Sequence, residues 1–140
     1  MRGIVVGGVA EYLGIPYAAA PVGSLRWQPP QLPAKFHDVL PAVQFGSACP
    51  QLDSFGVEFG SEDCLFLNVY IPRRAVLRRG TPHRLPVMVW IHGGGLTAGS
   101  GEFYDPTPLV KRGVIVVTIN YRLGLLGFFA QTALDAEGHE

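Results

Sequence analysis

The stretch that decides the fold is Pro86-Val87-Met88-Val89-Trp90-Ile91-His92-Gly93-Gly94-Gly95. Its first six residues form an apolar run, which is typical of a strand buried on both faces of a helix-covered sheet. Three glycines follow, and glycine leaves backbone N–H groups bare because it has no Cβ and tolerates positive φ. Two such groups that converge on one point can lower an acyl-transfer barrier by roughly 3–4 kcal/mol. The stretch therefore predicts a core strand that leads into an oxyanion-hole loop.

A second apolar run, at residues 114–119, has the same character as the first. Between the two runs, residues 108–112 fit a short helix, because Pro108 is tolerated in a first turn and Gly113 ends the pattern. Strand, helix and strand form a right-handed crossover into a parallel pair. Residues 86–119 are therefore predicted to form one βαβ unit of an α/β sheet.

Upstream of this unit, residues 65–71 have the composition of a further strand, which Pro72 stops. The basic stretch at residues 73–84 is predicted to be a solvated loop. Residues 14–50 are rich in proline and glycine, so we expect an extended, irregular segment there.

The N-terminus favours a β-hairpin. Residues 4–6 and 9–13 flank a Gly7-Gly8 pair, which can supply the positive φ angles of a primed turn. Residues 1–10 also faintly imitate a signal peptide, but the apolar region is short, broken by glycines and closed by Glu11. We therefore find no convincing signal peptide, and the compartment stays open.

Composition restricts the class of protein. The chain has 140 residues, 48% of them hydrophobic and 16% charged, as expected of one soluble globular domain. Eleven basic residues balance eleven acidic ones, so the chain has no net positive charge that would attract nucleic acid. The long apolar stretch at residues 114–130 is interrupted by Asn120, Tyr121 and Arg122, and it is too short and polar for a membrane-spanning helix.

The chain has two cysteines, Cys49 and Cys64. A disulfide between them would close a loop of about 15 residues and stabilise the fold by roughly 3 kcal/mol. The alternative is a pair of reduced, buried thiols. A bridge would favour an exported protein. Neither cysteine has a partner at zinc spacing, so no metal site is predicted.

Several motifs occur in order along the chain. They are Gly14-Ile15-Pro16-Tyr17-Ala18 with Leu25-Arg26-Trp27, then Glu62-Asp63-Cys64-Leu65-Phe66-Leu67-Asn68-Val69-Tyr70-Ile71-Pro72, then Trp90 to Gly95, and finally Asn120-Tyr121-Arg122-Leu123-Gly124. Together they resemble the type-B carboxylesterases, the α/β-hydrolase family that includes the cholinesterases. The resemblance implies a partial α/β-hydrolase domain over residues 1–140, with no second domain. It implies a mixed, mostly parallel sheet with an N-terminal antiparallel hairpin, incomplete in this chain.

The resemblance also implies roles for particular residues. The backbone N–H groups of Gly94 and Gly95 would be two oxyanion donors, and the residue after the nucleophile would supply a third. His92 and Gly93 would support the loop. The implied structural pairs are a disulfide, Cys49 with Cys64, and a buried ion pair, Arg26 with Glu62.

The chain also departs from the family pattern. Leu96 stands where an aromatic residue commonly follows the glycines, and Pro106 stands where a glycine is usual. These changes alter the lining of the pocket or the entry to the helix, and they remove no donor.

No serine of this chain lies in a Gly-x-Ser-x-Gly nucleophile elbow. Ser100 has glycines on both sides, but Ala98 and Glu102 occupy the positions where the elbow needs glycine. In the family the serine, the acid and the histidine all follow the oxyanion loop. We therefore expect a serine esterase by family that acts on small carboxylic esters without a cofactor or metal, and a 140-residue chain that is inactive alone.

Two other functions were weighed against the esterase hypothesis. Gly93-Gly94-Gly95-Leu96-Thr97-Ala98 matches the dinucleotide-binding pattern Gly-x-Gly-x-x-Ala, but the glycines and prolines that follow exclude the helix that this pattern needs. A non-catalytic, esterase-like binding or adhesion domain remains the other possibility, because fold does not dictate function.

Overall fold

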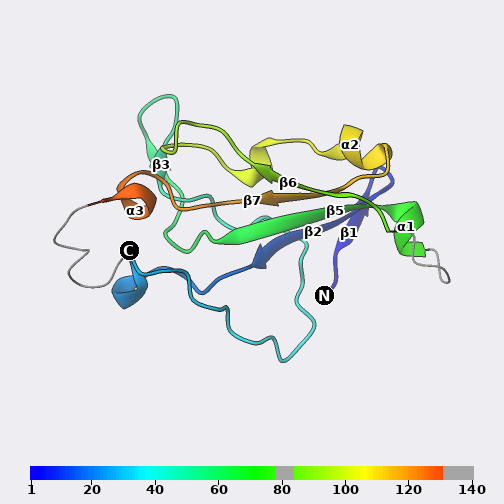
Figure 1. The fold of residues 1–140 in the computed structure, drawn as a ribbon, viewed down its shortest axis with the longest axis horizontal. Helices are drawn as coiled ribbons and strands as arrows, with labels where there is room; N and C mark the ends of the chain where they lie inside the picture. Colours follow the sequence, from blue (N-terminus) through cyan, green and yellow to red (C-terminus); the bar gives the residue numbers. More distant parts are fainter. Residues whose placement is uncertain (78–83, 131–140) are drawn as a thin grey trace.

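The computed structural model describes residues 1–77 and 84–130, in which the central feature is a five-stranded mixed sheet of order β1-β2-β5-β7-β6 (Figure 1). The strands are β1 (Ile4–Val6), β2 (Val9–Pro16), β5 (Phe66–Pro72), β6 (Val87–Ile91) and β7 (Ile115–Ile119). The predicted mixed sheet is confirmed, with one correction. Three pairings, β1-β2, β2-β5 and β5-β7, are antiparallel, and only β6-β7 is parallel. The prediction of a mostly parallel sheet is therefore wrong for the described residues. Only one crossover unit, from β6 to β7, lies in them, and each crossover gives one parallel pair.

The N-terminal hairpin forms where the sequence places it. Gly7 and Gly8 have φ angles of 55° and 87°, as a primed turn requires. β2 runs further than predicted, to Pro16, and its register with β5 shifts between Tyr12 and Ile15. Gly14 lies at this irregularity with a φ of 65°. Its N–H, which the irregularity releases from the ladder, donates to Asn68 Oδ1 at 2.9 Å.

The predicted βαβ unit is also confirmed. β6 and β7 pair in parallel from Val87 opposite Ile115 to Ile91 opposite Ile119. The connecting segment holds a 3-10 turn, η2 (Gly101–Phe103), and a helix, α2 (Thr107–Lys111). The helix begins and ends one residue before the predicted bounds, and Gly113 follows it with a φ of 92°. Glycine is favoured there because other residues adopt a positive φ only with strain.

The basic stretch after β5 differs from the prediction. A solvated loop was expected over residues 73–84, whereas the first five residues form a helix, α1 (Arg73–Leu77). Arginine, alanine and leucine are strong helix formers, so a segment with no turn residue can continue into a helix. The N–H of Arg73 donates to Gly8 O at 3.0 Å, which ties the start of α1 to the hairpin. Residues 78–83 lie outside the described part of the chain.

The remaining elements are short. They are η1 (Gly23–Leu25), the two-stranded pair β3 (Gln51–Leu52) and β4 (Glu58–Phe59), and α3 (Gly124–Phe128). The proline-rich segment between β2 and β3 is irregular apart from η1 and isolated bridges such as Leu13 with Val43, as expected.

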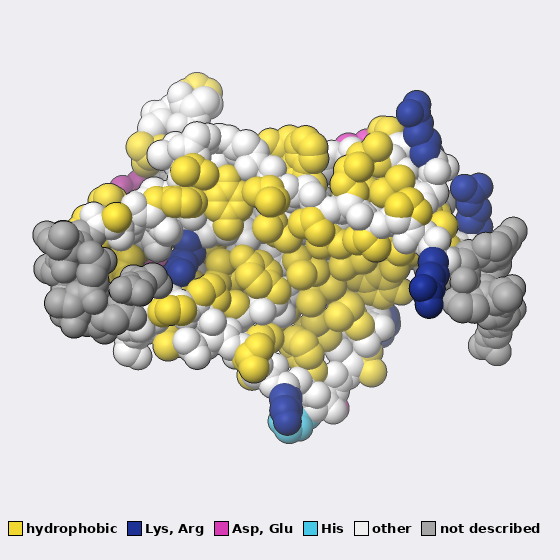
Figure 2. All heavy atoms as spheres, viewed as in Figure 1, with side chains coloured by type: hydrophobic (Ala, Val, Ile, Leu, Met, Phe, Trp, Pro, Cys, Tyr) yellow, Lys and Arg dark blue, Asp and Glu magenta, His cyan; other side chains and the backbone are white. Residues whose placement is uncertain are grey.

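Two clusters of buried side chains form the core. The first joins β2, β5, β7 and α2 and comprises Val9, Leu13, Tyr70, Val110 and Val116. The second surrounds the two cysteines and comprises Ala18, Cys49, Cys64, Leu65 and Leu123. β6 belongs to neither cluster, and its residues are 39–66% exposed. The expectation that this strand is buried on both faces is therefore wrong within this chain, because β6 is the edge strand. Figure 2 shows hydrophobic side chains gathered across the middle of the molecule on the face viewed.

Candidate active site

The glycine loop leaves the carboxyl end of β6 without entering a helix. Gly93, Gly94 and Gly95 are exposed to solvent. Within residues 1–77 and 84–130, the N–H groups of Gly94 and Gly95 donate no hydrogen bond. Both candidate oxyanion donors are therefore unpaired and accessible, in contrast to amides used in a helix or a strand ladder.

The direction of the Gly94 N–H is set by His92. His92 Nδ1 lies 2.8 Å from Gly93 O, and since a carbonyl only accepts, Nδ1 carries the proton. Gly93 O and the Gly94 N–H belong to one planar trans peptide, in which they point in opposite directions. Holding the carbonyl oxygen on one side therefore aims the Gly94 N–H to the other side.

The Gly95 N–H is fixed in the same way, one peptide later. Gly94 O accepts from Thr97 N and Ala98 N, each at 3.1 Å, and from Thr97 Oγ1 at 3.2 Å. These bonds immobilise the peptide plane that carries the Gly95 N–H. The backbone needs φ angles of 124° at Gly94 and 61° at Gly95, and the first is accessible only to glycine.

His92 is itself held firmly. Its side chain is buried, and the residue is 3% exposed. Its ring stacks on Tyr121 with centroids 4.3 Å apart and planes 15° apart. The Tyr121 hydroxyl donates to His92 O at 2.8 Å. Within the described ranges His92 Nε2 has no partner, so its lone pair is available to accept a hydrogen bond.

Leu96, the residue that departs from the family pattern, has a φ of 63° although it carries a side chain. Such a conformation costs about 1–3 kcal/mol and persists only where the surroundings impose it. Here Leu96 O accepts from Gly124 N, at the start of α3, at 2.8 Å. The loop is thus tied on its far side to the segment that follows β7.

Ser100 lies next to this loop but has the contacts of a structural residue. It is 1% exposed, and its Oγ donates to Asn120 Oδ1 at 3.1 Å. The same Oγ caps η2 by accepting from Glu102 N at 3.4 Å. This geometry agrees with the absence of a nucleophile elbow in the sequence.

Two buried amide side chains near the loop were missed in the sequence. Gln51 bonds both backbone groups of Gly99, and Asn120 bonds Ser100 and Gly101. Asn120 begins one of the motifs quoted above, which could have drawn attention to it. Gln51 gave no signal, since Gly99, its partner in the loop, is 48 residues away in the chain.

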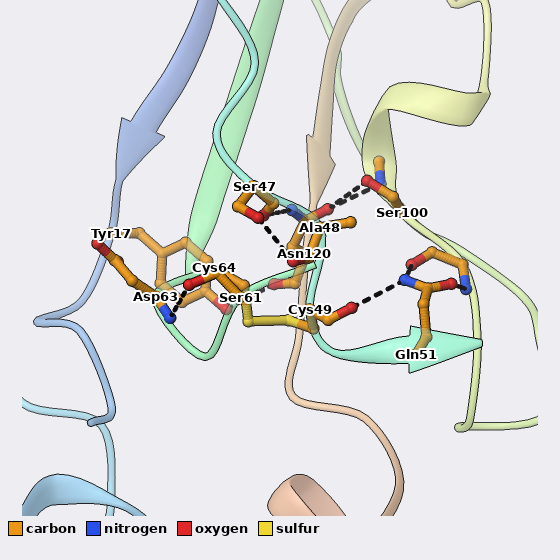
Figure 3. Close-up of a disulfide and its surroundings, with 12 residues drawn as sticks. Tyr17, Ser47, Ala48, Cys49, Gln51, Ser61, Asp63, Cys64, Ser100 and Asn120 are labelled. Carbon is orange, nitrogen blue, oxygen red and sulfur yellow. Dashed lines mark hydrogen bonds between the residues drawn. A yellow bond between two sulfur atoms is a disulfide. The ribbon is translucent and has the colours of Figure 1, made fainter. Parts of the chain in front are cut away.

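A half-buried tyrosine, Tyr17, holds the backbone of Asn120. Tyr17 donates its hydroxyl proton to Asn120 O at 2.6 Å, and burial raises the pKa of Tyr17. The phenol therefore stays a neutral donor over a wider pH range than an exposed tyrosine. Figure 3 shows Tyr17, Asn120 and Ser100 in the same region as the two cysteines.

The disulfide between Cys49 and Cys64 is formed, as the resemblance implied, with Cα atoms 5.0 Å apart (Figure 3). Both cysteines are buried in the second core cluster. The bond joins the segment that leads to β3 with the start of the β5 region. A disulfide is compatible with an exported protein.

Arg26 and Glu62 form the expected ion pair, and the contact is bidentate, with N···O distances of 2.6 and 2.5 Å. The hydrogen bonds that Arg26 donates to the Glu62 carboxylate raise the pKa of Arg26 further above its ordinary value. The expectation of a buried pair is wrong, because the side chains are 42% and 25% exposed. The pair lies at the surface of the irregular segment, where Arg26 also approaches the ring of Trp27.

The described part of the chain holds neither a cluster of metal ligands nor a membrane-spanning helix. No group of three or more His, Cys, Asp or Glu side chains in residues 1–77 and 84–130 is arranged to hold a metal ion. None of the helices in these ranges has the length and hydropathy that crossing a bilayer requires.

A mixed sheet in which one strand leads into a glycine loop is typical of an α/β-hydrolase. The family model described as "Carboxylesterase family" matches residues 1–139, and the chain belongs to this family.

Known relatives agree with this assignment. The chain is 45% identical to the fumonisin B1 esterase of Sphingopyxis macrogoltabida over 139 residues, which are 95% of this chain and 25% of the relative. It is 46% identical to the para-nitrobenzyl esterase of Bacillus subtilis (strain 168) over 138 residues, or 91% of this chain and 27% of the relative. A solved PNB esterase structure superposes with a TM-score of 0.82 at 43% identity, covering 96% of this chain and 27% of that one. The chain thus spans about a quarter of the length of these relatives.

Proposed function

We propose that this chain supplies the oxyanion-hole segment of a serine esterase that hydrolyses small carboxylic esters. The single observation that carries the proposal is the pair of N–H groups at Gly94 and Gly95, which have no acceptor among the residues that the structure describes. Each is aimed by a hydrogen bond to the carbonyl oxygen of its own peptide plane. Donors fixed before the substrate arrives need no reorganisation during the reaction, which is where such a site gains its rate.

In the proposed reaction, a serine outside these 140 residues attacks the carbonyl carbon of the ester, while a histidine takes the serine proton. The carbonyl electron pair moves onto oxygen, and this oxyanion accepts hydrogen bonds from Gly94 and Gly95. As the tetrahedral species collapses, the histidine gives that proton to the leaving oxygen, so the alcohol departs and an acyl-enzyme remains. Water then releases the carboxylic acid by the same sequence of steps. No metal or organic cofactor takes part.

His92 and Gly93 act as supporting residues in this proposal. The imidazole holds Gly93 O and so positions the Gly94 N–H. His92 is 3% exposed and its ring is stacked on Tyr121, so the imidazole is enclosed by the protein. Proton transfer is therefore assigned to the family's downstream histidine, and His92 keeps the loop in shape.

A chimera tests the proposal. This chain replaces the aligned segment of the Bacillus subtilis para-nitrobenzyl esterase, so that the downstream residues of that enzyme supply the nucleophile, acid and histidine. The relative's name points to para-nitrobenzyl esters as a first substrate. We expect the folded chimera to hydrolyse them with kinetics near those of the parent enzyme. A chimera that folds and binds ester but does not turn it over would contradict the proposal and favour a binding domain.

A further inference from the structure

Gln51 makes three hydrogen bonds with its side-chain amide, all to backbone groups. Its Oε1 accepts from Gly99 N at 2.7 Å, and its Nε2 donates to Gly99 O at 2.9 Å. Nε2 also donates to Cys49 O at 3.0 Å (Figure 3). The side chain is buried, with 9% of the residue exposed. Gln51 therefore fastens both polar groups of Gly99 to the chain segment that carries the disulfide.

Gly99 is packed against the part of the loop that aims the first oxyanion donor. A Cβ on Gly99 would lie 2.3 Å from His92 Nδ1 and 2.5 Å from Gly93 O. These two atoms form the hydrogen bond that fixes the Gly94 N–H. Because the backbone of Gly99 fills the space beside that bond, a displacement of Gly99 changes the contacts that hold His92 and Gly93 in place.

Gly99 also follows directly after the residue that fixes the second donor. Ala98 N donates to Gly94 O, and this bond orients the peptide that carries the Gly95 N–H. The loop from Gly94 to Gly99 is thus closed by the bond between Ala98 N and Gly94 O, and Gln51 holds it at Gly99. The φ of 117° at Gly99 permits this compact path.

We propose that Gln51 is a positioning residue of the oxyanion loop, which holds Gly99 so that the N–H groups of Gly94 and Gly95 converge. This inference rests on the proposed function for its catalytic consequence, whereas the mechanical coupling stands without it. Gln51 touches no reacting atom. It acts through Gly99, and then through His92 and Gly93.

A second amide keeps the same two segments together when Gln51 is changed. Asn120 accepts from Gly101 N at 2.8 Å and donates to Ser47 O at 3.1 Å. The disulfide at Cys49 anchors the Gln51 segment as well. Variants of Gln51 should therefore keep the fold while they lose hydrogen bonds to Gly99 and to Cys49 O.

The test uses Gln51→Ala and Gln51→Glu in the 140-residue chain, with Gln31→Ala as the matched control. Gln51→Glu keeps the size of the side chain and the acceptor for Gly99 N, but it cannot donate to the two carbonyl groups. Gln31 is exposed and its side chain donates to Pro29 O, so it resembles Gln51 in chemistry but not in position.

Nuclear magnetic resonance gives the first measurement. In both Gln51 variants we expect the amide signals of Gly94 and Gly95 and the imidazole nitrogens of His92 to shift, while those of β1, β2 and β5 stay in place. Loss of one hydrogen bond should speed hydrogen exchange at Gly99 N about tenfold in Gln51→Ala. The control variant should change none of these signals. Unchanged Gly94, Gly95 and His92 signals in both folded Gln51 variants would overturn the proposal.

The esterase chimera gives the second measurement. A positioning role predicts that Gln51→Ala and Gln51→Glu lower kcat about tenfold with KM unchanged, because the lost interaction matters in the transition state. A rise in KM at constant kcat would overturn the role. If the unmutated chimera does not turn over ester, the proposed function fails, and the resonance shifts still decide whether Gln51 positions the loop.

Discussion

Substituting the three glycines by alanine, one at a time, separates the oxyanion role from an ordinary turn. At Gly94 an added Cβ would lie 1.9 Å from Ala98 O, at a φ of 124°. At Gly95 the φ is 61°, and the nearest neighbour of a Cβ is Thr97 Oγ1 at 4.0 Å. At Gly93 the φ is unrestrictive and a Cβ would only reach the Tyr104 hydroxyl, at 4.0 Å. The structure thus ranks the three changes.

The expected magnitudes follow from these contacts. Gly94→Ala forces the Ala98 peptide to move, which disturbs both donors, so kcat should fall about 10²–10³-fold, the usual cost of losing an oxyanion donor. Gly95→Ala meets no obstacle, and its left-handed backbone costs roughly 1–2 kcal/mol of stability. Its kcat should change far less than that of Gly94→Ala. Gly93→Ala is the matched control and should stay within about threefold of the parent, as exposed substitutions do.

The assay is steady-state hydrolysis of a para-nitrophenyl ester by the esterase chimera, with urea unfolding of each variant as a parallel measurement. The reasoning predicts that kcat falls most for Gly94→Ala, while stability falls without a matching loss of kcat for Gly95→Ala. If Gly94→Ala turned over as fast as Gly93→Ala, the assignment of its N–H as a donor would be refuted.

Further outcomes concern the chain itself. The 140-residue chain alone should hydrolyse para-nitrophenyl esters no faster than buffer, because none of its serines lies in an elbow; turnover well above background would contradict this. Replacing Cys49 and Cys64 together by alanine should lower the free energy of unfolding by about 3 kcal/mol, since the bridge closes a loop of 15 residues, and a urea titration checks it. Burial raises the pKa of Tyr70 from its ordinary 10.0 to about 12. The folded state therefore binds that proton more tightly, so the stability due to Tyr70 is complete below pH 10 and disappears as the pH rises to about 12. Ultraviolet titration of phenolate, with Tyr70→Phe as the control, should show one tyrosine that resists ionisation until that range.

Much of the fold could be predicted because its signals are local. β6 and β7 are continuous apolar runs, the hairpin turn is a pair of glycines, and α2 is bounded by proline and glycine. The burial of β6 could not be predicted, since burial depends on what lies beside a strand. The helix α1 was missed because a short basic segment has the composition of a loop as well as of a helix.

In the candidate site, too, local features could be predicted from the sequence and long-range contacts could not. Gly94 and Gly95 could be proposed as oxyanion donors from the sequence, because three glycines after a strand are a local feature. The hydrogen bonds of Gln51 and Asn120 join segments that are far apart in the sequence and meet only in the folded chain. A buried glutamine cannot be told from an exposed one by sequence, so these contacts were not predicted. The pair of Arg26 and Glu62 was correctly matched, but its exposure depends on the surrounding irregular chain.

The most direct test of the oxyanion hole is a crystal structure of the esterase chimera after reaction with a trifluoromethyl ketone, which traps a tetrahedral adduct on the serine. The account predicts that the adduct oxyanion lies about 2.7–3.1 Å from both Gly94 N and Gly95 N. An adduct whose oxygen faces away from these atoms, or glycine amides bonded to carbonyl groups of the chain, would contradict it.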